Sequence, residues 1–259
     1  MPPMNLELIR QLEILAANAC PAAEVVHLDG WRLRAVDGVH RRANSVWPNE
    51  YGGRKSLTEK LQAVEAFYAG RRLPARYQMC PAALPTDLDA VLMKRGYVAE
   101  ARTNVQIADL AEVLKRTRAR RCDMVKVSNQ FNDNWYAAYY DSEGVNEKAA
   151  RERRGILQRI VPPKGFAEVQ YDGNPGALGM GVMEQGWVGV FAMATRPEFR
   201  RRGAATAVLH TLAEWGQAQG AARMYLQVME DNTPARALYS GIGFETLYTY
   251  YYRTAPGDR

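Results

Sequence analysis

A glycine-containing run of basic residues lies between a predicted strand and a predicted helix. The run is Thr195-Arg-Pro-Glu-Phe-Arg-Arg-Arg-Gly-Ala-Ala205. Before it, the apolar segment 187–194 has the length and the valine and phenylalanine content of a buried strand. After Gly203, apolar residues recur at the spacing of a helix with one packed face, at Ala205, Val208, Leu209, Leu212 and Trp215. The sequence therefore predicts a strand, a basic turn and a helix, in that order.

This turn has the residue types of an anion-binding site. A helix that begins directly after a turn directs free backbone N–H groups and the positive end of its dipole at one point. Gly203 would let a phosphate approach the backbone because it has no Cβ, and Arg200, Arg201 and Arg202 would add positive charge. The run differs from a Walker loop and from a dinucleotide fingerprint. A charged surface turn before an amphipathic helix would look the same, so the turn alone does not decide its function.

Three further motifs follow the turn. After a predicted strand over 222–229, the chain carries Asn232-x-x-Ala235, Leu238-Tyr239 and Gly243-Phe244-Glu245. Together with Arg200-x-x-Gly203-x-Ala205, these motifs resemble the GCN5-related N-acetyltransferase (GNAT) family from about residue 166 to residue 253. The resemblance implies an acyltransferase that uses acetyl-CoA as co-substrate and needs no metal.

The resemblance also implies which residues hold the donor. The pyrophosphate of the coenzyme would bind to the turn, at Arg200, Arg201, Arg202, Gly203, Ala204 and Ala205. The pantetheine arm would lie like an added strand along the end of the preceding strand, at Met193, Ala194 and Thr195. An N–H group near Met193 would polarise the thioester carbonyl, and Asn232 would hydrogen-bond the coenzyme. The alternative role of Asn232 is to cap the next helix, although Thr233, before Pro234, is the better expected N-cap.

Tyr239 resembles the general acid of the family. A phenol has a pKa of about 10, so it is protonated at neutral pH and can donate to a departing thiolate; a buried structural tyrosine is the alternative. The general base stays unassigned, because no spacing selects between Glu168 and Glu184. Other enzymes of this class carry a carboxylate on the strand before the phosphate turn, whereas the segment 187–194 has none. A proton relay through water, or an acceptor that is already neutral, is therefore expected.

The first half of the chain repeats the same order of predicted elements. They are a helix over 5–18, strands over 24–28, 31–36 and 42–47, a helix over 56–69, a strand over 75–80, a helix over 87–94 and a strand over 104–107. The first helix should direct inward Leu6, Ile9, Leu12 and Leu15. Asp29-Gly30 favours a tight hairpin turn, and Ser56 with Glu59 matches a capping box.

Two copies of one structural unit explain this repetition. The segment 92–97 parallels 238–244, since each ends in glycine and an aromatic residue. The predicted fold class is α/β (α+β), with two tandem GNAT-like units, each a mixed, mostly antiparallel sheet flanked by helices. Residues 1–118 would form a degenerate, non-catalytic domain, because nothing there matches the phosphate turn, Asn232 or Tyr239, and residues 119–259 would form the catalytic domain. An unrelated α+β domain is the alternative for the first half.

The middle of the chain is basic and then helical. The run 115–121 holds five basic residues without interleaved aromatic residues, which favours a solvated linker over a nucleic-acid contact. Helices are expected over 128–140 and 147–160. Their connection would lie over the acceptor site in the family, which makes Trp135, Tyr139 and Tyr140 candidate lining residues; ordinary core packing is the alternative for each.

Composition restricts the remaining choices. The 259 residues carry a formal net charge of +6, no apolar run is long enough to span a membrane, and Cys20, Cys80 and Cys122 are scattered without metal-site spacing. A cytoplasmic protein is expected. The predicted function is transfer of an acetyl group from acetyl-CoA to a primary amine of a small molecule, amino acid, peptide or protein, by direct attack in a ternary complex. No membrane or nucleic-acid partner is expected, a homodimer stays open, and the alternative function is a non-catalytic acyl-CoA sensor.

Overall fold

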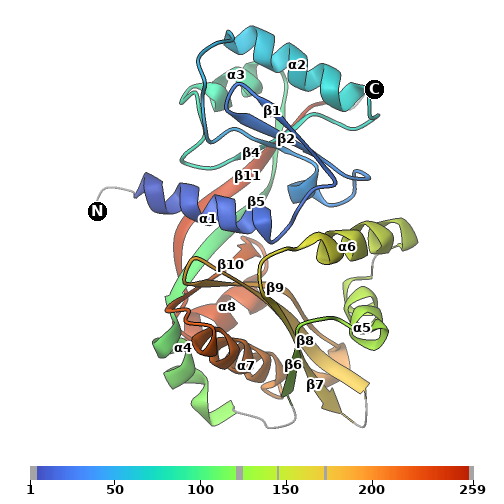
Figure 1. Cartoon of the computed structure of the whole chain (residues 1–259), viewed down its shortest axis with the longest axis vertical. Helices are drawn as coiled ribbons and strands as arrows, with labels where there is room; N and C mark the ends of the chain where they lie inside the picture. The colour runs from blue at the N-terminus through green and yellow to red at the C-terminus, as the bar shows by residue number, and fades with distance from the viewer. Residues whose placement is uncertain (1–4, 121–124, 145, 172–173, 257–259) are drawn as a thin grey trace. The chain divides into compact units, whose positions relative to one another are not determined.

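The chain divides into two compact units (Figure 1). The computed structural model describes residues 5–120, 125–144, 146–171 and 174–256. Unit 1 comprises Met1–Thr103, Arg151–Arg159 and Tyr248–Arg259, and Unit 2 comprises Asn104–Ala150 and Ile160–Leu247. The two units therefore interleave along the sequence, and the predicted boundary between residues 118 and 119 stays a prediction.

Unit 1 combines helices with a mostly antiparallel sheet. In chain order its elements are α1 (Leu6–Asn18), β1 (Glu24–Leu28), β2 (Trp31–Ala35), β3 (Val46–Trp47), α2 (Leu57–Ala69), β4 (Arg76–Met79) and α3 (Leu88–Lys94). Strands β5 (Val98–Asp109) and β11 (Glu245–Thr254) have residues in both units, as does α6 (Glu147–Arg159). The strand order in this part is β1-β2-β3-β4-β11-β5, and β3 pairs with β4 in parallel.

Several local predictions for Unit 1 are confirmed. Asp29 and Gly30 have φ angles of 46° and 90°, as the hairpin between β1 and β2 requires. The capping box of α2 is present, with Ser56 Oγ accepting from the Glu59 N–H and the Glu59 carboxylate accepting from the Ser56 N–H. The expectation for Leu6 was wrong, because its side chain is 39% exposed. Steps of three residues drift around a helix of 3.6 residues per turn, and Glu13 takes a place on the buried face of α1 instead.

Two predicted elements have different bounds. The expected strand over 42–47 is only the short β3, preceded by a 3₁₀ turn (Arg41–Ala43). Asn44 directs its Oδ1 to the N–H groups of Val36 and Gly38, which favours a compact loop over an extended strand. The helix expected from residue 128 was also wrong at its start, because β6 (Val125–Ser128) pairs with the next strand and α5 (Asp133–Glu143) begins at the N-cap Asn132.

Unit 2 also holds a mixed, mostly antiparallel sheet, as predicted. After α4 (Leu110–Thr117) and a 3₁₀ turn (Arg118–Arg120), its further elements are β7 (Lys164–Tyr171), β8 (Asn174–Glu184), β9 (Trp187–Thr195), α7 (Ala204–Ala218), β10 (Arg223–Met229) and α8 (Thr233–Gly241). The strand order is β11-β5-β10-β9-β8-β7-β6. Strands β6 to β9 pair antiparallel in sequence, and β9 pairs with β10 in parallel.

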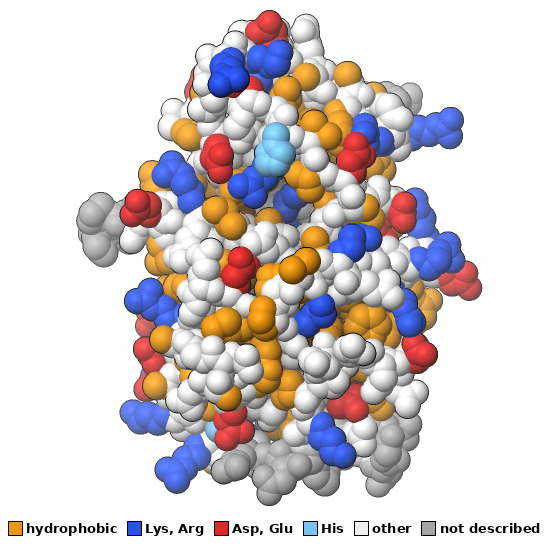
Figure 2. Space-filling view, viewed as in Figure 1, with side chains coloured by type: hydrophobic (Ala, Val, Ile, Leu, Met, Phe, Trp, Pro, Cys, Tyr) orange, Lys and Arg blue, Asp and Glu red, His pale blue; other side chains and the backbone are white. Residues whose placement is uncertain are grey.

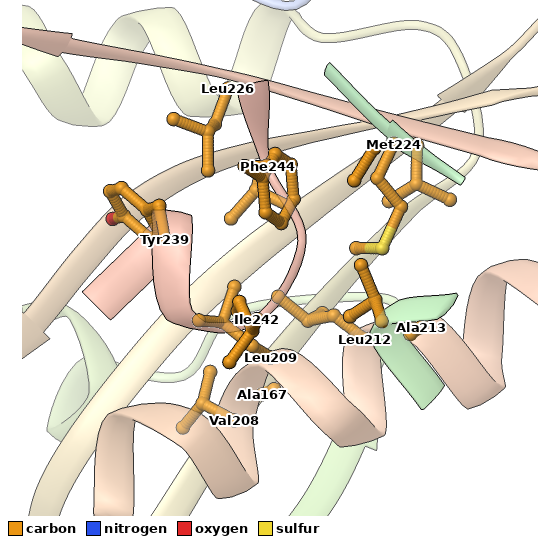
Figure 3. Close-up of a cluster of buried hydrophobic side chains, with 14 of the residues drawn as sticks. Ala167, Val208, Leu209, Leu212, Ala213, Met224, Leu226, Tyr239, Ile242 and Phe244 are labelled. Atoms are coloured by element: carbon orange, nitrogen blue, oxygen red, sulfur yellow. The ribbon is translucent and has the colours of Figure 1, made fainter. Parts of the chain in front are cut away.

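The core of Unit 2 lies between α7 and one face of the sheet. Val208, Leu209 and Leu212 are fully buried, which confirms the predicted inward face of the helix. Figure 3 shows them beside core residues of α8 and β10 and beside Phe244, which lies just before β11. The opposite face of the sheet is covered by α5, because Trp135 packs on Phe166, the neighbour of the core residue Ala167 on β7. No helix in the described ranges has both the length and the hydropathy to cross a bilayer.

Candidate active site

The strand before the basic turn separates from its parallel neighbour. The pairing of β9 with β10 runs from Trp187 opposite Arg223 to Val190 opposite Leu226. Both strands are described throughout, and beyond that point their register contains no further pair. Residues 191–195 of β9 therefore present a backbone edge to the space beside β10.

A β-bulge causes this separation. On β8, Leu178 pairs with Ala194 and Met180 pairs with Phe191, so Ala192 and Met193 together oppose Gly179. Ala192 has a φ angle of 50°, a left-handed conformation that a non-glycine residue rarely adopts. A bulge bends its strand and increases its twist, and it places Met193, Ala194 and Thr195 on the free edge of β9.

The side chain of Met193 packs between the bulge and α7. A Cβ at Gly179 would lie 2.4 Å from the Met193 sulfur and 2.9 Å from Val208 on α7. A residue larger than glycine at position 179 would therefore displace the methionine from its place against the helix. Since this side chain packs into the core, the backbone of Met193 is the part that remains available at the strand edge.

The basic turn forms a left-handed entry into α7. Arg201 and Gly203 have φ angles of 61° and 81°. Gly203 is the N-cap of the helix and offers no side-chain acceptor, while its carbonyl accepts the first helical bond from Ala207. The N–H groups of Ala204 and Ala205 belong to the first turn, where a helix has no acceptor of its own. The turn thus has the backbone geometry that an anion requires.

The three arginines of the turn are not equivalent. Arg200 donates from Nε to the Thr195 carbonyl at 3.2 Å, so its side chain closes the turn. Arg201 is exposed, and the exposed Arg202 places its guanidinium 5.6 Å from the centre of the Phe199 ring. Arg201 and Arg202 therefore carry exposed positive charges, whereas Arg200 is bonded to the turn itself.

Arg120 contributes a cation that the sequence analysis missed. A Cβ at Gly203 would lie 3.1 Å from its Cδ, 3.2 Å from its Nε and 3.3 Å from its Cζ. Arg120 belongs to the predicted basic linker, whose only signal was its charge. Arg121, the last residue of that linker, and Cys122 lie outside the described residues. On the face drawn in Figure 2, basic and acidic side chains of the described residues are interspersed, unlike a continuous nucleic-acid track.

Buried hydrogen bonds hold Arg120 near the turn. Thr117, at the end of α4, donates from Oγ1 to the Val113 carbonyl at 2.6 Å. The same oxygen lies 2.8 Å from Nδ1 of His210 on α7. The two atoms form a buried hydrogen bond between α4 and α7. The end of α4 is thereby fixed to α7, three residues before Arg120.

Tyr239 lies at the edge of the Unit 2 core. Its side chain is 7% exposed and its ring meets Phe244 edge-on, with 5.9 Å between the ring centres. Figure 3 shows the hydroxyl directed away from the labelled apolar side chains. Burial raises the pKa of Tyr239 to about 12. The phenol is therefore protonated at neutral pH and available as a donor.

Asn232 has a local role that the structure makes visible. It is the N-cap of α8, and its Oδ1 accepts from the Ala235 N–H at 3.2 Å. The preference for Thr233 as the cap was wrong, because Thr233 is the first helical residue and Pro234 the second. The capping bond uses only the oxygen of the exposed side-chain amide. A contact of Asn232 with the coenzyme stays a prediction.

The aromatic residues of α5 differ in exposure. Trp135 is 2% exposed and donates from Nε1 to the Ala167 carbonyl at 3.1 Å, so core packing is its role. Tyr139 lies against Trp135 with 5.7 Å between ring centres, and Tyr140 is partly exposed. Asp141 at the end of this helix lies 3.7 Å from Arg196, just after β9. The pair connects α5 with the start of the basic turn.

Comparison with known proteins agrees with this geometry. Residues 7–253 match the family described as the C-terminal part of the probable histone acetyltransferase Rv0428c. The chain is 31% identical over 245 residues to the uncharacterized N-acetyltransferase YobR of Bacillus subtilis, which covers 95% of this chain and 98% of that protein. The chain belongs to the GCN5-related N-acetyltransferase family. It is an acyltransferase.

Other GNAT proteins match over most of the chain. The probable histone acetyltransferase Rv0428c of Mycobacterium tuberculosis is 27% identical over 255 residues, covering 93% of this chain and 72% of that protein. A GCN5-related N-acetyltransferase from Kribbella flavida superposes with a TM-score of 0.67 at 18% identity, over 98% of this chain and 96% of that one. A tandem GNAT protein from the clavulanic acid biosynthesis pathway gives a TM-score of 0.55 at 13% identity, over 83% and 76%. These structures share the fold of this GNAT protein.

Among the described residues, no group of three or more His, Cys, Asp or Glu side chains lies close enough to hold a metal ion. The β9 edge and the basic turn offer backbone amides and arginines, which are groups that bind phosphates.

Proposed function

We propose that this GNAT protein transfers an acetyl group from acetyl-CoA to a primary amine by direct attack within a ternary complex. The observation that carries the proposal is the bulge in β9, which frees a backbone edge that leads directly into the glycine turn of α7. An extended thioester arm can add to a free strand edge, and a diphosphate can bind at a helix N-terminus. The strand edge and the turn follow one another along the chain in the same order as the pantetheine arm and the diphosphate follow one another along coenzyme A.

The turn would hold the phosphates and the strand edge would hold the arm. Backbone N–H groups from Arg201 to Ala205 would bind the diphosphate, with charge from Arg202 and Arg120. Arg200 would act by keeping the turn closed on the Thr195 carbonyl. The backbone of 193–195 would pair with the pantetheine arm, and Asn232 would contact it from the start of α8.

The transfer itself needs an oxyanion donor and an acid. The neutral amine nitrogen attacks the thioester carbon, and an N–H near Met193 stabilises the charge on the carbonyl oxygen. The C–S bond then breaks, and the departing thiolate takes a proton from the Tyr239 hydroxyl. The nitrogen of the new amide releases its extra proton to solvent, from which Tyr239 is reprotonated. The acetyl group would pass directly to the amine without a covalent enzyme intermediate, because no cysteine lies in the motif region from residue 166 to residue 253.

A thiol-release assay tests this function. Acetyl-CoA is offered with spermidine, free amino acids, an alanine-starting peptide and a lysine-containing histone-tail peptide, and calorimetry measures acetyl-CoA binding in parallel. The histone-tail probe follows from the name of the Mycobacterium tuberculosis relative. We expect amine-dependent thiol release. Tight binding without thiol release for any amine would favour the acyl-CoA sensor, and no binding would overturn both.

A further inference from the structure

Glu168 on β7 lies in one row with the free edge of β9. In the antiparallel register Glu168 opposes Leu178 on β8, and Leu178 opposes Ala194 on β9. Directly opposed residues point to the same face of a sheet. Two strand spacings separate Glu168 from Ala194, which is roughly 10 Å between backbones. Its side chain thus stands on the α5 face, level with the proposed thioester site.

One oxygen of the Glu168 carboxylate has no hydrogen-bond partner in the part of the chain that the structure describes. Oε1 accepts from Gln170 Nε2 at 2.7 Å. Oε2 is buried and, among the described residues, makes no hydrogen bond. The indole N–H of Trp135, which covers the same face, is already bonded to the Ala167 carbonyl. A buried carboxylate oxygen without a partner is unfavourable, so it calls for a ligand, a water or a function.

Charged residues lie on the elements that pair with or cover this face, namely β6, α5 and the segment after β9. Lys126 opposes Glu168 directly on β6 and is exposed. Asp141 on α5 and Arg196 after β9 lie 3.7 Å apart and form a pair with each other. A protonated amine that enters this face would meet Oε2 of Glu168, which has no hydrogen-bond partner among the described residues.

The second carboxylate that the sequence offered is excluded by register. Glu184 alternates to the same face of β8 as Leu178, but it pairs with Trp187 at the hairpin end of the strand. Six residues separate it from Leu178, which is about 20 Å along the strand. A carboxylate so far from the bulge cannot reach an amine placed there, even through one water.

We propose that Glu168 is the general base for the acceptor amine, acting through one ordered water. The inference rests on the proposed function. The acceptor ammonium gives a proton to the water, and the water gives a proton to Oε2 of Glu168. The neutral amine then attacks the thioester carbon, the C–S bond breaks, and Tyr239 protonates the thiolate. The nitrogen of the new amide gives its second proton to solvent, and Tyr239 takes a proton back from solvent. The acceptor class that fits is a primary amine that is protonated at neutral pH.

The variant Glu168→Gln tests this assignment with Glu184→Gln as matched control. Both are assayed from pH 6 to pH 10 with the amine that the wild type acetylates best, and thermal melting checks folding. We expect Glu168→Gln to lower kcat by about 100-fold or more at pH 7, with acetyl-CoA binding unchanged. The loss should shrink as pH rises above the pKa of the amine, because the acceptor then needs no base. Glu168→Asp should retain part of the activity.

Three outcomes would overturn the inference while leaving the proposed function intact. They are wild-type activity in Glu168→Gln, a loss that is the same at every pH, and an equal loss in Glu184→Gln. If Glu168→Gln does not fold, the Glu168→Asp variant decides by the same pH criterion. Absence of amine-dependent thiol release in the wild type would instead overturn the proposed function, and this inference with it.

Discussion

The two units treat their buried carboxylates differently. In Unit 1, Glu13 on α1 accepts from the Tyr248 hydroxyl at 2.7 Å, the Gln78 side-chain amide at 2.8 Å and the Trp47 indole at 3.0 Å. In Unit 2, Glu168 accepts one bond, from Gln170, and keeps a buried oxygen without a partner among the described residues. Both oxygens of Glu13 accept hydrogen bonds from neighbouring side chains. In contrast, Oε2 of Glu168 has no hydrogen-bond partner among the described residues.

Glu152 in Unit 1 also accepts hydrogen bonds on both of its carboxylate oxygens. It accepts from the N–H groups of Val39 and His40 at 2.8 and 2.7 Å, and from the Asn44 amide at 2.9 Å. Burial lowers the pKa of His40 to about 3, so the ring stays neutral beside this network. Satisfied buried networks make a fold rigid and specific, whereas unpartnered and strained groups tend to mark functional sites. For these three carboxylates, the contrast fits the proposed role of Glu168 in Unit 2.

The largest effect should come from Tyr239→Phe in Unit 2. Loss of the general acid should reduce kcat by about 10²–10⁴-fold, because the thiolate would leave without a proton. The ring and its contact with Phe244 remain, so the melting temperature and acetyl-CoA affinity should stay near those of the wild type. Steady-state kinetics and calorimetry measure both quantities. Unchanged kcat would reduce Tyr239 to a packing residue.

A substitution in the hydrogen-bonded network of Unit 1 should change the stability of the fold and not the turnover. Glu152→Ala removes the acceptor of one buried side-chain donor and two half-buried backbone donors, and we expect the free energy of unfolding to fall by about 2–3 kcal/mol. Urea titration measures the change, with the exposed Glu147→Ala on the same helix as control. Turnover per folded molecule should persist. A loss of kcat without a loss of stability would contradict the division of roles between the units.

The protonation of Glu13 gives a pH test. Burial raises the pKa of Glu13 above its ordinary value, so the folded state favours the protonated acid. Its contribution to stability is therefore full below the unfolded-state pKa of about 4.3 and is lost as pH rises through the higher folded-state pKa. Glu13→Gln keeps an acceptor for Trp47 and Gln78 and should remove this pH dependence.

Urea titrations of both proteins from pH 4 to pH 8 follow the Glu13 effect. The stability of the wild type relative to the variant should decrease with rising pH. A relative stability that increases with pH would mean that hydrogen bonds to the charged carboxylate outweigh the desolvation of Glu13.

The smallest effect concerns Arg120 in Unit 2. An exposed ion pair of one arginine with a phosphate contributes about 0.2–1 kcal/mol, so Arg120→Gln should weaken acetyl-CoA binding by up to about fivefold. The effect should diminish as salt is added. Arg118→Gln, in the same 3₁₀ turn, is the control. Equal weakening by both variants would indicate general charge and not a position next to Gly203.

Local patterns could be predicted from the sequence because they act over a few residues. The hairpin at Asp29-Gly30, the capping box at Ser56 and the buried face of α7 each depend on neighbours within a turn or two. Predictions that required distant partners were less complete. The segment before α5 became β6 because it pairs with β7, and β3 stayed short because Asn44 bonds to the backbone before it.

By itself the sequence determined the family of this protein, since the turn around Gly203, Asn232 and Tyr239 lie within one short segment whose spacing resembles that family, and it predicted the proposed donor side. Only the tertiary structure decided which distant residues join them. Arg120 reaches Gly203 through the packing of α4 on α7, and Glu168 is distinguished from Glu184 by strand register. Register and helix packing are set by many long-range contacts acting together, so no local spacing encodes them.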